Sequence, residues 1–129
     1  MKKRAAIYLR VSKDEQATEN QIPEVKRLAR TRGFAVVETY EEHVSAAKAR
    51  PEFDRMMRDA HRGMFDVLVV WALDRLGRSM VGNLQAVLAL DAGGVHVVSV
   101  REPWLDTGDV NELMNKVSAL SVLSNTVLV

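Results

Sequence analysis

Apolar residues along this chain fall into short runs that alternate with stretches of helical periodicity. Four runs have the length and the β-branched bias of strands, and they cover residues 5–11, 34–40, 65–71 and 95–100. Between these runs apolar residues recur every three or four positions, which is the spacing of one face of a helix. The predicted helices begin after Thr18, with Pro51 and after Ser79, and a glycine marks the end of each. Residues 41–50 have no periodicity and are predicted to form a loop.

The alternation of strands and helices predicts an α/β fold. We expect a mainly parallel sheet of four to five strands, flanked by helices, with a long C-terminal helix. Residues 65–71 are nearly all apolar, as expected of a strand that is covered on both faces. Sites of such sheets lie beyond the carboxyl ends of the strands, so polar residues at these ends are the first candidates for chemistry.

The last part of the chain has a different pattern. From Val110 to Val127 apolar or small residues recur at steps of three or four, which predicts a long helix over residues 109–127. Residues 118–129 contain no charged side chain. An apolar segment of this kind avoids water, so we expect it to pack on the domain or to meet a partner.

Composition limits the class of protein. The 129 residues suit one domain, and 47% hydrophobic with 27% charged residues is typical of a soluble fold. Cysteine is absent, which excludes disulfides and thiolate metal ligands, and no apolar stretch is long enough for a membrane helix. We therefore expect a cytoplasmic protein with no membrane partner. The net charge is only +1, so a nucleic-acid role has to depend on local clusters of arginine.

Two polar segments follow predicted strands. The first strand leads into Arg10 and Ser12, and the third leads into Asp74, Arg75 and Arg78. If these strands are neighbours, a serine hydroxyl meets several guanidinium groups at one edge of the sheet. Guanidinium groups match phosphate oxygens, and a serine nucleophile needs such stabilisation, so a phosphodiester is the substrate that this cluster suits. A serine hydrolase is not indicated, because the Gly-x-Ser-x-Gly motif is absent.

The same residues carry a resemblance to a known family. Residues 8–12, Tyr-Leu-Arg-Val-Ser, and residues 74–79, Asp-Arg-Leu-Gly-Arg-Ser, resemble two signatures of the catalytic domain of serine recombinases, the resolvase and invertase group. Between them Gln16, Gln21 and the pair Arg50-Pro51 match further positions of the family. The resemblance covers nearly the whole chain.

The resemblance implies site-specific DNA recombination and the residues that perform it. Ser12 attacks a DNA phosphodiester and holds the 5′ phosphate as a phosphoserine ester, which frees a 3′ hydroxyl. The ester conserves the bond energy, so religation needs no ATP, and neither a metal nor another cofactor is expected. The arginines bind the phosphate, Asp74 orients an arginine or shares in proton handling, and the glutamines support the site by hydrogen bonds. The implied catalytic residues are Ser12, Arg10, Arg50, Asp74, Arg75 and Arg78, and the supporting residues are Tyr8, Gln16, Gln21 and Glu41.

The resemblance also implies partners. We expect DNA and a homo-oligomer, a dimer that forms a tetramer on DNA, assembled through helix 109–127, in a bacterial or phage-encoded protein associated with the nucleoid. In the family this helix continues toward a DNA-binding domain, whereas this sequence ends at Val129. Residues 1–129 are therefore expected to be one catalytic domain with a truncated helix and no DNA-binding domain. Whether the parent is a resolvase, an invertase, an integrase or a transposase-like enzyme stays open.

One loop departs from the family pattern. Where the family has Asp-x-Gly-x-Ser-Gly, residues 41–46 read Glu-Glu-His-Val-Ser-Ala. Glu41 keeps the charge of aspartate on a longer side chain. His43 and Ala46 replace glycines, so a position that needs a positive φ is expected to be strained. His43 is either an exposed loop residue or a catalytic base, and the base for Ser12 stays unassigned.

Other functions compete with this one. The truncated helix and the altered loop favour, as an alternative, a catalytically silent oligomerisation fragment of a recombinase. A flavodoxin-like domain that binds a small molecule would need a glycine-rich or acceptor-rich loop after the first strand, where Arg10 and Lys13 stand instead. The basic residues of the first helix are expected to form a solvated face, with contact to the DNA backbone as the alternative; they are Lys26, Arg27, Arg30 and Arg32.

Overall fold

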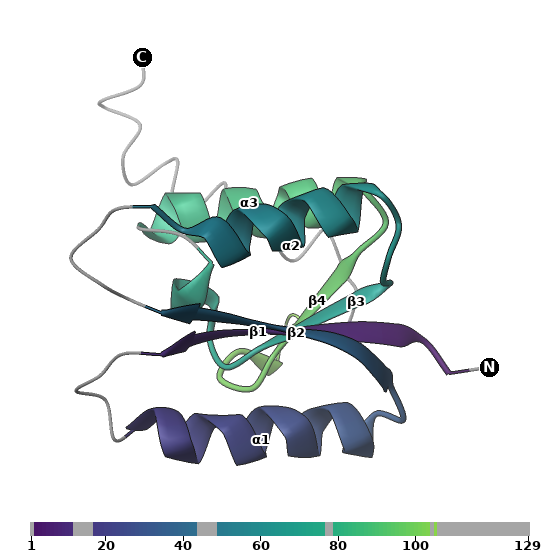
Figure 1. The fold of residues 1–129 in the computed structure, drawn as a ribbon, viewed down its shortest axis with the longest axis vertical. Helices are drawn as coiled ribbons and strands as arrows, with labels where there is room; N and C mark the ends of the chain where they lie inside the picture. The colour runs from purple at the N-terminus through teal and green to yellow at the C-terminus, as the bar shows by residue number, and fades with distance from the viewer. Residues whose placement is uncertain (1, 12–16, 44–48, 77–78, 104, 106–129) are drawn as a thin grey trace.

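The fold is a parallel sheet with helices on both faces, as the sequence predicts (Figure 1). The computed structural model describes residues 2–11, 17–43, 49–76, 79–103 and 105. In chain order the elements are β1 (Arg4–Val11), α1 (Ala17–Thr31), β2 (Ala35–His43), α2 (Pro51–His61), β3 (Val67–Val70), the short 3-10 helix η1 (Leu73–Arg75), α3 (Met80–Ala92) and β4 (His96–Ser99). The predicted helix over residues 109–127 lies outside the described residues.

The strands of the described residues pair in the order β2-β1-β3-β4, and every pairing is parallel. Parallel neighbours cannot be joined by a tight turn, so a helix crosses over between them. Helix α1 covers one face of the sheet, and α2 and α3 cover the other (Figure 1). As a result, the carboxyl ends of all these strands point to the same end of the sheet.

Side chains on β1 alternate between two apolar cores. Ala6 and Tyr8 belong to the core that includes residues of α2 and α3, whereas Ile7 and Leu9 belong to the core that includes residues of α1. The same alternation puts Arg10, the next residue after Leu9, on the side of α2 and α3.

Local signals define the ends of α2 and α3, as predicted, whereas α1 begins at Ala17, before the predicted cap Thr18. Pro51 occupies the first turn of α2, where its missing N–H costs no hydrogen bond. Ser79 caps α3, because its Oγ accepts the N–H of Gly82 at 3.0 Å. After α2 the chain turns at Gly63, whose φ of 73° suits a residue without a side chain. None of the helices in these ranges is long and apolar enough to span a membrane.

Strand β2 is longer than the pattern predicts. Residues 41–43 are predicted as loop, yet they continue the strand because β1 runs on to Val11 and supplies partners for them, among them the pair Arg10–Glu42. On its other side β2 has no partner strand among the described residues, so it is an edge strand of this sheet. Edge strands commonly carry charged residues. A search for alternating apolar residues therefore does not recognise residues 41–43 as strand. The strain expected of a position with a positive φ does not arise at His43, because every described residue with a positive φ is a glycine. Ala46 lies outside the described residues.

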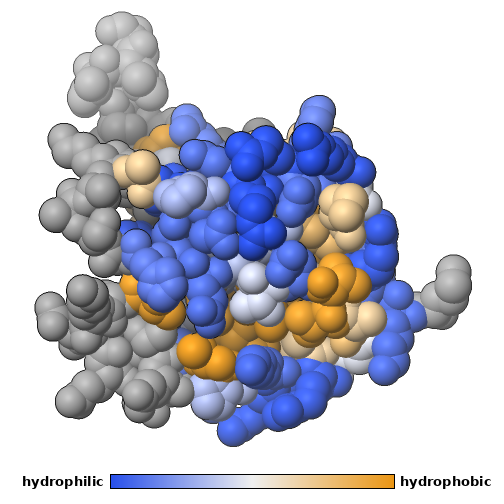
Figure 2. Space-filling model, viewed as in Figure 1, coloured by the Kyte–Doolittle hydropathy of each residue, from blue (hydrophilic) through white to orange (hydrophobic). Residues whose placement is uncertain are grey.

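The surface along β2 is mixed. Figure 2 shows hydrophilic side chains over α2 and an apolar strip between α2 and α1. On β2 itself, Val36 and Val37 are about half exposed, at 46% and 51%. The charged residues that follow on the same strand disfavour pairing with a further strand.

Candidate active site at the carboxyl edge of the sheet

Two segments of the chain that carry predicted site residues meet at the carboxyl edge of the sheet. β1 leads there to Arg10, and β3 leads there through η1, which contains Asp74 and Arg75. Tyr8 lies in register with Val70 of β3 on one side and with Tyr40 of β2 on the other. The predicted neighbourhood of the first and third strands is therefore confirmed, since β1 and β3 pair directly. Ser12, Gln16 and Arg78 lie outside the described residues, so their positions stay predictions.

Arg50 links the start of α2 to the segment after β3. Its Nη1 donates a hydrogen bond to the carbonyl oxygen of Leu76 at 2.9 Å, and its guanidinium carbon lies 4.0 Å from the centre of the Phe53 ring. Phe53 in turn contacts Tyr8 edge to face, with ring centres 5.8 Å apart. These contacts run from Leu76 through Arg50 and Phe53 to β1, and they bring Arg50 beside the two segments that carry Arg10 and Arg75.

The hydroxyl of Tyr8 lies in a charged setting inside the protein. Tyr8 is fully buried, and its hydroxyl makes no hydrogen bond with the described residues. Burial raises the pKa of Tyr8 to about 12, and the negative charge of Glu42 acts in the same direction. The positive charges of Arg50 and Arg10 oppose this rise in the pKa. Arg50 lies close to the Tyr8 hydroxyl, but the two groups do not meet the geometry of a hydrogen bond. Tyr8 is therefore a neutral hydroxyl at physiological pH, close to two guanidinium groups and one carboxylate.

Two arginines of the site have buried nitrogen atoms without an acceptor. The Nε atoms of Arg10 and Arg75 are inaccessible to water, and neither donates a hydrogen bond within the part of the chain that the structure describes. Arg75 Nε is 3.7 Å from Asp74 Oδ1, which is an ion pair but too long for a hydrogen bond. A buried donor without a partner costs about 1–3 kcal/mol. Both side chains remain partly exposed, so an anion at this edge would be attracted by the charge of the two guanidinium groups. This electrostatic setting suits a phosphate.

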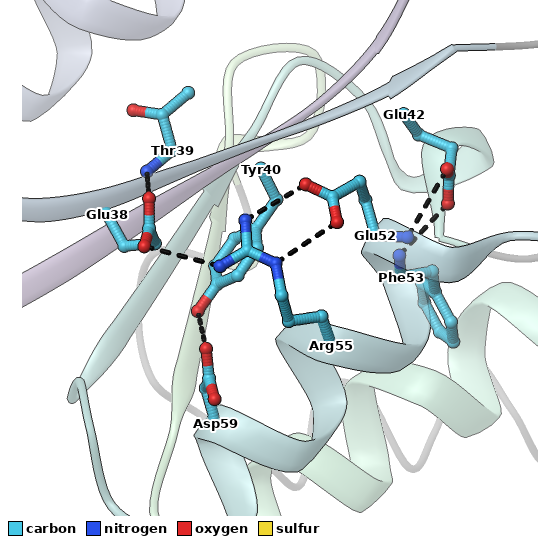
Figure 3. A network of polar contacts seen from close by, with 8 residues as sticks. All are labelled: Glu38, Thr39, Tyr40, Glu42, Glu52, Phe53, Arg55 and Asp59. Carbon is cyan, nitrogen blue, oxygen red and sulfur yellow. Dashed lines mark hydrogen bonds and ion pairs between the residues drawn. The ribbon is translucent and has the colours of Figure 1, made fainter.

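Glu42 is the residue of this site that the sequence did not single out. It is buried, at 3% exposure, and its carboxylate accepts the N–H of Phe53 at 3.0 Å and that of Glu52 at 3.3 Å (Figure 3). A carboxylate here satisfies two donors at the N-terminus of α2 and complements the positive end of the helix dipole. Arg50, the residue just before α2, is thereby held in place through the backbone. If residues 41–43 had been predicted as strand, the alternation of side chains along it would have placed Glu42 on the same buried face as Tyr40.

The structure places the remaining predicted residues apart from this cluster or at its rim. Glu41 is exposed and lies in register with Leu9, on the side of the other core. Asp74 is exposed, with 73% of its side chain accessible. Gln21 is buried on α1, and His43 is exposed at the end of β2. Within the described ranges no group of three or more histidine, aspartate or glutamate residues could hold a metal ion.

A polar network fastens β2 to α2 next to the site (Figure 3). Arg55 pairs with Glu52 at 2.9 Å and with Glu38 at 3.4 Å, and its guanidinium lies 4.4 Å above the ring of Tyr40. The Tyr40 hydroxyl donates to Asp59 at 2.7 Å. The hydrogen bonds with Arg55 lower the pKa of Glu52. The pKa of Tyr40 is raised above its usual value, mainly by burial and then by the hydrogen bond to Asp59. The network holds α2 against β2, and so it supports the position of Arg50.

An α/β domain with arginines gathered at the carboxyl edge of a parallel sheet is a candidate phosphate-handling enzyme. A sequence model described as "Resolvase, N terminal domain" matches residues 5–124. The chain therefore belongs to the resolvase N-terminal domain family.

Curated relatives agree with this assignment. The chain is 38% identical over 101 residues to the probable DNA-invertase y4cG of Sinorhizobium fredii (strain NBRC 101917 / NGR234). The matched region covers 78% of this chain and 30% of the relative. It is 39% identical over 99 residues to the transposon Tn2501 resolvase of Escherichia coli, which covers 73% of this chain and 48% of the relative. The chain thus spans less than half the length of these two relatives.

Solved structures share the fold. The N-terminal catalytic domain of TP901-1 integrase is 29% identical, with a TM-score of 0.67, over 88% of this chain and 98% of that chain. The C-terminal catalytic domain of ISC1926 TnpA, an IS607-like serine recombinase, is 27% identical, with a TM-score of 0.66, over 75% of this chain and 70% of that chain.

Proposed function

We propose that this chain is the catalytic domain of a site-specific DNA recombinase with Ser12 as its nucleophile. The observation that carries the proposal is the pair of partly buried guanidinium groups of Arg10 and Arg75, which belong to two segments that meet at the carboxyl edge. Their Nε atoms have no acceptor among the described residues. Ser12 follows Arg10 by two positions in the sequence, and in this proposal its hydroxyl lies at this edge of the sheet. Family membership and the catalytic domains among the structural neighbours support the same reaction.

The reaction proceeds by exchange of phosphate esters. Ser12 Oγ attacks the phosphorus of a DNA backbone, the Oγ–P bond forms, and the bond from phosphorus to the 3′ oxygen breaks. The proton of Ser12 passes to a base, and the departing 3′ oxygen takes up a proton. Attack by a 3′ hydroxyl of another strand reverses these steps, so religation conserves the number of ester bonds and needs no external energy source.

Arginines supply the electrostatic part of catalysis. Negative charge gathers on the phosphate oxygens in the transition state, and positioned guanidinium groups stabilise it. Arg10, Arg50 and Arg75 perform this role together with Arg78. Tyr8 supports the site from within the core, since its buried ring packs on Phe53, which in turn stacks on Arg50. Glu42 is a positioning residue, because it caps α2 and thereby holds Arg50.

DNA and further copies of the chain are the partners in this proposal. Recombination joins strands from two sites, so several subunits have to act together, and residues 109–127 provide the apolar surface for their assembly. The supporting observation is the absence of charge from residue 118 to the end. Localisation at the nucleoid follows from DNA as the substrate.

A covalent adduct tests the function. The protein is incubated with duplexes that carry a nick close to the scissile position, so that the short 3′-ended fragment diffuses away and religation stalls. We expect a protein–DNA adduct on a denaturing gel and a 5′-phosphoserine at Ser12 by mass spectrometry, both lost in Ser12→Ala. An adduct that persists in Ser12→Ala disproves the assignment of the nucleophile. Self-association of the protein without any adduct on recombination-site DNA favours the silent oligomerisation fragment instead.

A further inference from the structure

A second cluster of positive charge lies at the opposite end of the sheet from the catalytic edge. Lys2, Lys3 and Arg32 line an open hollow together with Gly33 and Phe34. The hollow forms where β1 begins and α1 ends. The start of β2, just beyond α1, is joined to Lys3 by a hydrogen bond from Ala35 N–H to the Lys3 carbonyl oxygen at 2.9 Å. Figure 1 shows the N-terminal end of β1 far from the ends of β1 and β2 that lead to the candidate active site. β1 has eight residues, so the two regions are about 25 Å apart.

The hollow is built to present cations. The guanidinium carbon of Arg32 lies 5.3 Å from the centre of the Phe34 ring, so the ring helps to hold the cation in place. The last turn of α1 is closed by hydrogen bonds from Gly33 and Phe34 N–H to carbonyls of the helix. Because these carbonyls are satisfied, the end of the helix repels an anion less than an open C-terminus would.

Neighbouring groups show that positive charge dominates here. His96, the first residue of β4, has its pKa lowered by burial and then by Lys3 and Arg32, while Asp91 acts in the opposite direction. The nearby carboxylate of Asp66 is already engaged by Arg4, which donates to it from Nη2 at 3.1 Å and from Nε at 3.2 Å. The hollow itself is lined by no acidic residue within the described chain. A net charge of only +1 for the whole protein makes this local excess informative.

The geometry points to the Lys2–Lys3–Arg32 hollow as a second, non-catalytic contact for the phosphate backbone of duplex DNA. The choice of DNA as the ligand rests on the proposed function. In this proposal the hollow binds a part of the duplex that lies at a distance from the scissile phosphate. Lysine and arginine bind phosphates without reading the base sequence, so the contact raises affinity rather than specificity. The contact therefore increases the affinity of the protein for duplex DNA beyond what the catalytic edge provides.

Binding of a random-sequence duplex tests the proposal by fluorescence anisotropy over a range of salt concentrations. All proteins carry Ser12→Ala, so that cleavage does not contribute. The test variant is Lys2→Gln/Lys3→Gln/Arg32→Gln, and the control Lys26→Gln/Arg58→Gln/Arg101→Gln removes the same charge from exposed positions elsewhere. We expect at least a tenfold loss of affinity in the test variant and about a twofold loss in the control. The slope of log Kobs against log salt should fall by about 2–3 in the test variant, because each phosphate contact contributes about 0.9.

Three further measurements keep the outcomes distinct. A charge-conserving variant, Lys2→Arg/Lys3→Arg/Arg32→Lys, should keep its affinity, which separates lost charge from lost folding. Equal losses in test and control variants overturn the proposal, since net charge alone then accounts for binding. A changed sedimentation coefficient of the test variant without DNA also overturns it, because the hollow then contacts another copy of the chain.

Inorganic phosphate, titrated at constant ionic strength, distinguishes a small-anion site. Saturation by phosphate that a duplex cannot displace overturns the assignment to DNA. The adduct assay at Ser12 is independent of these results, so failure of either proposal is recognised separately.

Discussion

Arg50 and Leu76 are joined by a hydrogen bond of 2.9 Å from the Arg50 Nη1 to the Leu76 carbonyl oxygen, across 26 positions of sequence. The bond connects the start of α2 to the end of the segment that carries Asp74 and Arg75. It explains how a residue from a loop after β2 reaches an edge formed by β1 and β3. The arginine serves two purposes, because the same guanidinium stacks on Phe53 and lies near Tyr8.

Arg50 should not tolerate a change to lysine. The substitution Arg50→Lys keeps the charge but provides no planar group that both stacks on Phe53 and donates to Leu76. We expect the rate of adduct formation in single-turnover assays to fall by about 100-fold or more, the cost of losing one transition-state donor. Arg58→Lys, at an exposed position near the other end of α2, is the matched control and should behave as the unmodified protein. A rate within twofold of normal for Arg50→Lys would show that charge alone is needed.

Glu42 should act through Arg50. In Glu42→Gln the cap of α2 weakens, so we expect the free energy of unfolding to fall by about 1 kcal/mol in urea titrations. The rate of adduct formation should fall about tenfold. In an Arg50→Ala background the same change should slow adduct formation little further, because the effect of Glu42 on the rate passes through Arg50. Glu41→Gln is the control, since that side chain is exposed on the other side of the strand; equal effects of both changes would contradict the positioning role.

Tyr8→Phe should leave both catalysis and stability nearly unchanged. The hydroxyl is buried without a hydrogen-bond partner among the described residues, so its removal relieves a desolvated group. We expect the free energy of unfolding to stay within about 1 kcal/mol of normal or to rise. Adduct formation should proceed at the normal rate, because a hydroxyl that water does not reach is closed to the phosphate as well. A large loss of stability, measured by urea unfolding, would show that the hydroxyl has a structural partner instead.

Tyr40→Phe should instead reduce the stability. The Tyr40 hydroxyl donates to the Asp59 carboxylate at 2.7 Å, and hydrogen bonds to charged groups contribute about 1.5–3 kcal/mol. We therefore expect a loss of about 2 kcal/mol in urea unfolding, with Arg55 still stacked on the ring. Asp59→Asn keeps an acceptor and should cost less. Equal stability of Tyr40→Phe and the unmodified protein would mean that water replaces the hydroxyl without cost.

Alkaline pH should destabilise the protein. The pKa of Tyr8 rises from 10.0 in the unfolded chain to about 12 in the folded protein, so the folded state keeps its proton where the unfolded state has lost it. The stabilisation is complete below pH 10 and is lost as the pH rises toward about 12. Tyr40 shifts in the same direction. The free energy of unfolding, followed by circular dichroism over this range, should fall less steeply in Tyr8→Phe, and an unchanged slope would contradict the shift.

Much of the architecture could be predicted from local signals. Pro51, Ser79 and the glycines define helix ends because they act through their own backbone, and the apolar runs identify strands because burial requires them. β2 was predicted too short, since Glu41 to His43 are strand only through pairing with β1. Arg10 and Arg75 were singled out because the motifs that contain them follow strands. Glu42 was not, because the end of β2 was predicted as loop.

The sequence by itself determined the α/β class, the number and order of the helices up to residue 92, and the residue types suited to a phosphodiester. These depend on periodicity, caps and side-chain chemistry, which are local properties of the chain. Only the tertiary structure decided that Arg50 bonds to Leu76, that Glu42 rather than Glu41 faces the site, and that Lys2, Lys3 and Arg32 share one hollow. Such relationships arise from the pairing of distant strands and the packing of helices on the sheet, and no short stretch of sequence contains them.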